Sequence, residues 1–270
     1  MDRRLTPFSG RVAHVSLAGQ TAAPLTEGEP ASIAPALADL LARPGGPIDR
    51  QLIHGEAVTV IDRRDGHTFV MAAKDGYCGW LAEGAVGPVL RATHRVQSPA
   101  THLYPEPRVQ APPRRSLYLN ARLQVTGQTG AWAKTPHGFV PVRHLAPLTE
   151  PAEDPVAVAE TLLHAPYLWG GNSVAGVDCS GLVQLAFHAA GRQMPGDSDL
   201  QQSIGREIPA GEEQRGDLIF WKGHVALITG PDRILHANGH TMDVAYEPLS
   251  ATIARISASG GGPVTARKRP

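Results

Sequence analysis

Three side chains in the last third of the sequence have the types that a thiol-dependent reaction needs. Cys179 stands in "VDCSG", directly before an apolar run. His224 in "GHVALITG" and His236 in "ILHANG" lie in short runs that are typical of β-strands. A cysteine nucleophile needs a base that takes its proton, and a second polar group can hold that base in one tautomer. If the two runs are neighbouring antiparallel strands, the two imidazoles lie side by side.

The position of Cys179 predicts a reactive thiol. The stretch "CSGLVQLAFHAAG" has an apolar face at helical spacing, and Gly191 is expected to end the helix. Cys179 would then lie in the first turn, where Asp178 can cap the helix. The unpaired N–H groups and the helix dipole at such a start favour a thiolate and lower its pKa.

Spacing alone leaves other interpretations of these residues open. A cysteine beside an apolar helix is most often a packed core residue, and twelve histidines make chance Cys/His pairs easy. One cysteine and two histidines also match the ligand set of some zinc sites, although no CxxC pair supports one. Cys78, the second cysteine, is expected to be a small buried side chain. A disulfide between Cys78 and Cys179 is not expected.

Composition and charge exclude several classes of protein. The chain has 270 residues, 42% of them hydrophobic, and a formal net charge of zero. This balance offers no electrostatic reason to bind nucleic acid or an anionic membrane surface. The first twenty residues lack the apolar stretch of a secretory signal, and no apolar run approaches the length of a membrane span. The sequence therefore predicts a cytoplasmic protein without a membrane span.

The first half of the chain changes period several times. Residues 1–46 are expected to be irregular, with one short amphipathic helix over residues 33–41 because Ile33, Leu37, Leu40 and Leu41 recur at helical spacing. Residues 47–90 alternate β-type runs with Gly-containing turns, and residues 91–148 repeat that pattern more weakly. This predicts two small all-β barrels in tandem, followed by a linker.

The last block, residues 149–256, is expected to be an α+β domain. Asp154 followed by Pro155 is a helix-start signal, and two predicted helices precede three short strands. Residues 257–270 end in the basic run "TARKRP", which is expected to be a flexible, solvated tail.

Four motifs in the last block carry a resemblance to a known family. "PYLWGGNSVAGVDCSGLVQLAF", "PGDSDLQQSIG", "GDLIFWKGHVALITG" and "ILHANG" resemble, in this order, the NlpC family of papain-like bacterial cell-wall cysteine peptidases. The similarity covers about residues 154–250. The upstream blocks resemble the bacterial SH3-like domains that accompany a cytosolic branch of that family, mainly through "DGYCGWL". The resemblance implies a papain-like α+β catalytic domain preceded by two SH3-like barrels.

Matching positions then imply roles for single residues. Cys179 matches the nucleophile, His224 the general base and His236 the orienting residue, whereas Tyr167 matches a tyrosine near the oxyanion site. The remaining matches concern substrate binding: the groove residues Asp178, Ser180 and Ser198, the acidic residue Asp197 that meets a free amine, Tyr77 and Glu56 that close the pocket over that amine, and Trp169 as a wall. For Trp169, plain packing is an equal alternative.

The resemblance implies hydrolysis of the γ-D-glutamyl–L-diamino acid bond in peptidoglycan stem peptides with a free N-terminal L-alanine. The expected partner is such a peptide, the expected role is recycling of cell-wall peptides, and no cofactor is expected. One alternative is an exported endopeptidase that acts on intact peptidoglycan. Another is a wall-binding module that has lost catalysis, although the intact Cys179, His224 and His236 set argues against it.

Overall fold

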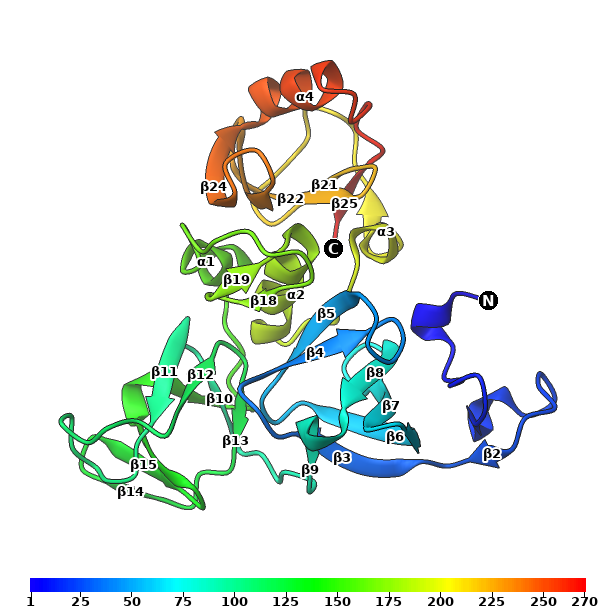
Figure 1. The fold of residues 1–270 in the computed structure, drawn as a ribbon. Coiled ribbons are helices and arrows are strands. Elements are labelled where there is room, and N and C mark those ends of the chain that lie inside the picture. Colours follow the sequence, from blue (N-terminus) through cyan, green and yellow to red (C-terminus); the bar gives the residue numbers. More distant parts are fainter. The chain divides into compact units, whose positions relative to one another are not determined.

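The computed structural model describes all 270 residues, which divide into two compact units, Met1–Glu150 and Pro151–Pro270. The first unit is built almost entirely of strands, and the second combines helices with a six-stranded sheet (Figure 1). The predicted α+β region and the predicted all-β region are thus separate bodies of the chain. Each is described by itself below.

A seven-stranded antiparallel sheet forms the N-terminal half of the first unit. Its strand order is β5-β4-β8-β7-β6-β3-β9. Its apolar core includes Leu40, Val58, Val70 and Leu81, contributed by four different strands. The strands are β3 (Glu29–Ile33), β4 (Leu37–Leu41), β5 (Ile48–Ile53), β6 (Ala57–Arg64), β7 (His67–Ala72), β8 (Cys78–Ala82) and β9 (Val86–Gly87). This confirms a small SH3-like β fold in this region.

The helix expected over residues 33–41 is wrong. The segment forms the end of β3 and all of β4, which pairs with β5 and β8. Burial along β4 alternates as in a strand, with Ala38 and Leu40 buried and Asp39 exposed. Helical spacing of four apolar residues was a weak signal, because strand pairing, here mainly with the next strand β5, overrides local preference. The sheet therefore also includes strands that precede residue 47.

The second half of this unit consists of smaller antiparallel sheets, in line with the weaker second β pattern. Their orders are β13-β10-β17, β11-β12 and β14-β15-β16. The strands are β10 (His94–Val96), β11 (Ala100–Leu103), β12 (Arg115–Tyr118), β13 (Arg122–Leu123), β14 (Gly127–Thr129), β15 (Trp132–Thr135), β16 (Gly138–Pro141) and β17 (Leu145–Pro147). A short parallel pair and four 3-10 turns complete the unit: β1 (Ala13–His14), β2 (Leu25–Thr26), η1 (Arg3–Leu5), η2 (Val15–Leu17), η3 (Glu83–Ala85) and η4 (Val142–His144).

The second unit is organised around a six-stranded antiparallel sheet of order β20-β25-β21-β22-β23-β24. Its strands are β20 (Arg206–Glu207), β21 (Leu218–Trp221), β22 (His224–Gly230), β23 (Arg233–Asn238), β24 (Asp243–Pro248) and β25 (Ala266–Arg269). Its helices and one small hairpin are α1 (Pro155–Glu160), α2 (Cys179–Ala189), α3 (Ser198–Gln201), α4 (Leu249–Ala258), β18 (Asn172–Ser173) and β19 (Gly176–Val177). The predicted order, helices first and strands afterwards, holds for α1, α2 and the strands β21 to β23, whereas the hairpin β18–β19 precedes α2 and helix α4 lies between β24 and β25.

Different helices contact the sheet of the second unit. Helix α2 lies against β22 and β23. Helix α4 packs Ile253 and Ile256 onto a cluster that includes Trp221 and Ile228. Ten of the eleven residues of α2 are buried, so its start is held rigidly. Helix α4 was not foreseen from the sequence, and it matters for the site below.

The flexible tail expected at residues 257–270 is also wrong. Its last residues form β25, which is inserted between β20 and β21. Its basic side chains have acidic partners: Arg267 lies 2.7 Å from Glu213, and Arg269 lies 2.8 Å from Asp217. These acidic partners lie some fifty residues earlier in the chain, so the sequence around the basic run gave no sign of them.

No helix of the structure is long and apolar enough to cross a membrane; the longest has 11 residues.

Candidate active site

Cys179 is the first residue of α2, as predicted. Asp178 is the N-cap: its Oδ1 accepts a hydrogen bond of 2.7 Å from the Gly181 N–H. The same carboxylate accepts from the Ser180 hydroxyl at 3.1 Å and, through Oδ2, from the Gly170 N–H at 2.9 Å. Asp178 therefore ties the preceding Gly-rich loop (residues 168–177) to the start of α2, and it fixes the position of the Cys179 thiol.

The Gly-rich loop can reach the helix start because side chains are missing there. A Cβ on Gly181 would lie 2.6 Å from the Gly171 carbonyl oxygen, and one on Gly171 would lie 2.5 Å from the Gly176 carbonyl oxygen. Real Cβ atoms do not approach so closely, so backbone meets backbone at these two positions. Gln201, fully buried, supports the arrangement by donating to the Ser180 carbonyl at 3.0 Å.

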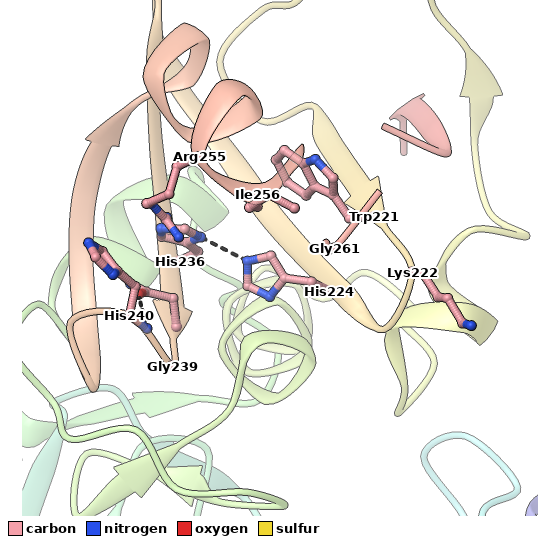
Figure 2. Close-up of a pocket in the computed structure, with 10 residues that line it drawn as sticks. Trp221, Lys222, His224, His236, Gly239, His240, Arg255, Ile256 and Gly261 are labelled. Carbon is pink, nitrogen blue, oxygen red and sulfur yellow. Dashed lines mark hydrogen bonds between the residues drawn. The ribbon is translucent and has the colours of Figure 1, made fainter. Parts of the chain in front are cut away.

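The two histidines lie side by side on neighbouring antiparallel strands, as predicted. Nε2 of His224 lies 2.8 Å from Nδ1 of His236 (Figure 2). The strands pair Leu227 with Leu235, so the two imidazoles are on one face of the sheet and diagonal to each other. A pocket of about 190 Å³ is lined by both rings, Trp221 and Arg255 among others. The two rings therefore lie at a cavity in the protein.

The same chain of contacts continues to two residues that sequence reasoning missed. Nε2 of His236 lies 2.7 Å from Oε2 of Glu247 in β24, and Arg255 of α4 donates to that oxygen. The cross-strand register explains the first contact, because His236 pairs with Ala245 and Glu247 is two residues further along. Neither residue belongs to a recognisable motif. Only the strand register and the position of α4 reveal them.

The predicted thiolate at Cys179 is wrong for the free protein. Burial, reinforced by the neighbouring Asp178 carboxylate, raises the pKa of the Cys179 thiol to about 12. Backbone N–H groups of Val225 and Ser180 face the sulfur and oppose the rise, but burial outweighs them. Burial also lowers the pKa of His224 to about 3, with His236 and Arg255 adding to the effect. The resting pair is a neutral thiol and a neutral imidazole.

The N–H of Val225 at the thiol places Cys179 against the start of β22, since Val225 directly follows His224. Tyr167 lies at the same place, paired with Val177 in a parallel bridge. Burial, Cys179 and Asp178 raise the pKa of Tyr167 to about 12. Its hydroxyl therefore keeps its proton and can donate a hydrogen bond to a developing oxyanion.

The other predicted groove residues of this unit are spread over three elements. Ser180 is buried in the first turn of α2, and Asp197 and Ser198 form the start of α3. Trp169, by contrast, lies in the Gly-rich loop and is 66% exposed. Packing does not explain a tryptophan with that exposure, so the alternative of a wall toward solvent stays.

The two predicted site residues of the first unit are deeply buried within it. Tyr77 belongs to the core of the seven-stranded sheet and carries the Arg50 guanidinium 5.1 Å from its ring centre. Glu56 forms an ion pair of 2.6 Å with Lys74, and both side chains are 8% exposed. Its other oxygen accepts from the Ile53 N–H. The Glu56 carboxylate therefore already has a cationic partner.

No group of three His, Cys, Asp or Glu side chains in the structure is placed to hold a metal ion. Both cysteines are free thiols.

Comparisons with known proteins agree with this geometry. The family described as "NlpC/P60 family" matches residues 164–256, and the one described as "Bacterial dipeptidyl-peptidase Sh3 domain" matches residues 40–86. A "Gamma-D-glutamyl-L-lysine dipeptidyl-peptidase" of Bacillus subtilis (strain 168) is 36% identical over 38% of this chain. That match spans only 37% of the relative's length.

Two further relatives extend over more of the sequence. A protein of the same name from Bacillus cereus is 26% identical over 75% of this chain and 71% of its own length. A crystal structure of an NlpC/P60 family protein from Bacillus cereus has a TM-score of 0.75 at 21% identity, covering 89% of this chain and 99% of that one. The second likeness concerns the fold, and it covers both the β region and the α+β region.

Proposed function

Because this chain combines an NlpC/P60 domain with a bacterial dipeptidyl-peptidase SH3 domain, we propose that it is a cysteine peptidase that hydrolyses peptide bonds of peptidoglycan stem peptides. The observation that carries the proposal is the start of α2. There the Cys179 thiol lies against the strand that begins with His224. The Nε2 atom of His224 lies 2.8 Å from Nδ1 of His236. This is the arrangement that acyl transfer through a thioester requires.

The reaction begins from the neutral pair. Nδ1 of His224 takes the proton of the Cys179 thiol as the sulfur attacks the scissile carbonyl carbon, and the carbonyl electrons move onto oxygen. The Cys179 backbone N–H and the Tyr167 hydroxyl donate to that oxyanion. When the tetrahedral intermediate collapses, the C–N bond breaks and the imidazolium returns its proton to the leaving amine. Water, deprotonated by His224, then hydrolyses the thioester and restores the thiol.

For the substrate, we propose the bond between γ-D-glutamate and the following L-diamino acid, in peptides with a free N-terminal L-alanine. Two relatives carry a name that refers to this type of bond, for the lysine case. A cationic amine in a partly buried groove needs a carboxylate, since burying an unpaired charge is costly. Asp197, half-buried at the start of α3, is our first candidate for that carboxylate.

The roles of Tyr77 and Glu56 stay predictions. Lys74 already lies 2.6 Å from Glu56. Glu56 can therefore bind a substrate amine only if Lys74 moves away or if the two cations share the carboxylate. The diamino acid itself, diaminopimelate or lysine, is left open by the proposal. We also propose that the protein recycles cell-wall peptides in the cytoplasm. The alternative role is that of an exported enzyme that remodels the intact wall.

The test is a paired digest. The protein is incubated with L-Ala-γ-D-Glu-diaminopimelate and with its N-acetylated form, and products are followed by mass spectrometry. Release of the dipeptide L-Ala-γ-D-Glu from the free-amine peptide alone supports the proposal. Equal cleavage of both forms removes the free-amine requirement, and solubilisation of purified sacculi favours wall remodelling. Absence of any cleavage, with folded protein, overturns the peptidase assignment.

A further inference from the structure

A continuous series of side chains runs from the proposed base through the buried His236 to the partly exposed Glu247 and Arg255. His224 contacts His236 at 2.8 Å, and His236 contacts Glu247 at 2.7 Å. Glu247 is in turn ion-paired with Arg255. The His236 side chain is completely buried, and that of Glu247 is 17% exposed. Figure 2 shows Arg255 and His236 on the side of His224 that carries Nε2.

The chemistry of these groups leaves a single pattern of protons. Arg255 can only donate, and a carboxylate can only accept. Glu247 therefore accepts both from Arg255 and from Nε2–H of His236. Burial lowers the pKa of His236, although Glu247 opposes this, and so favours the neutral ring with one proton. With the proton on Nε2, its Nδ1 must accept, so Nε2 of His224 donates to it.

This pattern determines which atom of His224 is basic. A neutral imidazole with its proton on Nε2 has its lone pair on Nδ1. In the structure Nε2 is turned toward His236, so Nδ1 lies on the other side of the ring (Figure 2). In the opposite tautomer the lone pair of His224 would point at His236, and the thiol would have no base. The tautomer thus decides whether His224 can act at all.

We propose that Glu247 is a positioning residue for the reaction: it accepts the Nε2 proton of His236, and through His236 it sets the tautomer of the base His224. Arg255 holds the Glu247 carboxylate in place by a charge-assisted hydrogen bond. Strand β24 and helix α4 belong to the site for this reason. The inference rests on the proposed thiol chemistry only where it refers to catalysis, because the tautomers exist whether or not a peptide is cleaved.

The first experiment reads the tautomers directly. Protein labelled with ¹⁵N in histidine is examined by long-range ¹H–¹⁵N NMR near pH 7, with His224→Ala and His236→Ala spectra for assignment. We expect protonated Nε2 and unprotonated Nδ1 on both rings, and a mixture of tautomers in Glu247→Met. A wild-type His236 protonated on Nδ1, or an unchanged tautomer in Glu247→Met, would overturn the proposal. This holds even if the wild-type protein has no peptidase activity, which would count against the proposed function alone.

The second experiment separates positioning from structure. Glu247→Met is expected to lower kcat about 100-fold with little change in KM, which is less than the roughly 10⁴-fold loss when a carboxylate in direct contact with the base is replaced. An asparagine at position 236 can accept from His224 without help from Glu247. In a His236→Asn background, Glu247→Met should therefore lower kcat by less than about threefold. An equal loss in both backgrounds would mean that Glu247 acts only through folding, and the proposal would fail.

A matched ion pair supplies the control. Glu213 lies 2.7 Å from Arg267, and its side chain is about as buried as that of Glu247. Glu213→Met removes a comparable ion pair from the same unit without touching the histidines. It is expected to keep kcat within about twofold and to show the wild-type tautomers. If it lowers kcat as much as Glu247→Met does, the effect is one of stability and the assignment of Glu247 is overturned.

Discussion

The two cysteines of this chain are alike in burial and in the direction of their pKa shift. Cys78 is 1% exposed and Cys179 is 7% exposed. Burial raises the pKa of each thiol to about 12. Neither burial nor acidity distinguishes them, and a ranking by thiolate content would treat them as equals.

Their neighbours differ. Cys78 belongs to an apolar cluster with Phe69 and Trp80 and donates to the Gly76 carbonyl at 3.3 Å. Cys179 lies in the first turn of a helix, against the strand that begins with His224. What makes a buried thiol a nucleophile is a base for its proton and donors for the charge that develops. If these neighbours decide reactivity, changes at Cys179 and at Cys78 should have different effects.

The largest expected difference is in activity. Cys179→Ala should lower kcat/KM for the free-amine stem peptide by at least about 10³-fold, because nothing else supplies the nucleophile. Cys78→Ala should change it by less than about twofold. Steady-state rates of both variants on L-Ala-γ-D-Glu-diaminopimelate check this. Residual activity above one tenth in Cys179→Ala would mean that the wrong cysteine, or the wrong chemistry, has been chosen.

Next in size is recognition of the amine. Asp197→Asn should lower kcat/KM about 10- to 100-fold for the free-amine peptide, which corresponds to the loss of a hydrogen bond between charged groups. Any residual cleavage of the N-acetylated peptide should not change. Glu56→Gln is the comparison, and it is expected to have the smaller effect because Lys74 already neutralises Glu56. A larger loss of kcat/KM in Glu56→Gln than in Asp197→Asn would mean that Glu56, in the first unit, binds the amine.

Alkylation by iodoacetamide compares the thiols without a substrate. At pH 7 both should react slowly, since both pKa values are raised to about 12. Cys179 should still react about tenfold faster than Cys78, because His224 can take its proton. Peptide mass spectrometry gives both rates in one sample. If His224→Ala leaves the ratio unchanged, His224 is not the base.

Stability should respond to the other cysteine. Cys78→Ala leaves a cavity beside Phe69 and Trp80, and we expect a loss of about 1–2 kcal/mol in the free energy of unfolding of the first unit. Urea titration followed by tryptophan fluorescence measures it. A stability loss accompanied by a loss of peptidase activity would link Cys78 to the site, contrary to the comparison.

The smallest expected effect is that of pH. His224 is the base only when neutral, and burial lowers its pKa to about 3, so acid should not inactivate it near pH 6. The thiol stays protonated until its pKa of about 12. We expect kcat/KM to vary less than about threefold between pH 5.5 and pH 7, below the range in which the substrate's own amine loses its proton at about pH 8. An acid limb near pH 6.5 would show that His224 titrates as an exposed histidine does.

Prediction from the sequence succeeded where local patterns and motifs agree. The helix beginning at Cys179, its Asp178 cap and the strands that begin with His224 and contain His236 all have short-range signals. It failed where strand pairing decides, whether with the next strand, as for β4, or with a distant one, as for β25. The helix expected over residues 33–41 and the tail expected after residue 257 both became sheet strands. A single sequence holds no direct sign of such pairings.

By itself the sequence determined the order of the reactive groups, the helix that presents Cys179 and the α+β character of its domain, because capping, periodicity and turn residues act over a few positions. Only the tertiary structure decided the state of the thiol and the partners of the second histidine. Burial is a property of the assembled core, and it reversed the expected pKa of Cys179. The contact of His236 with Glu247 depends on strand register, and that of Glu247 with Arg255 on where α4 packs.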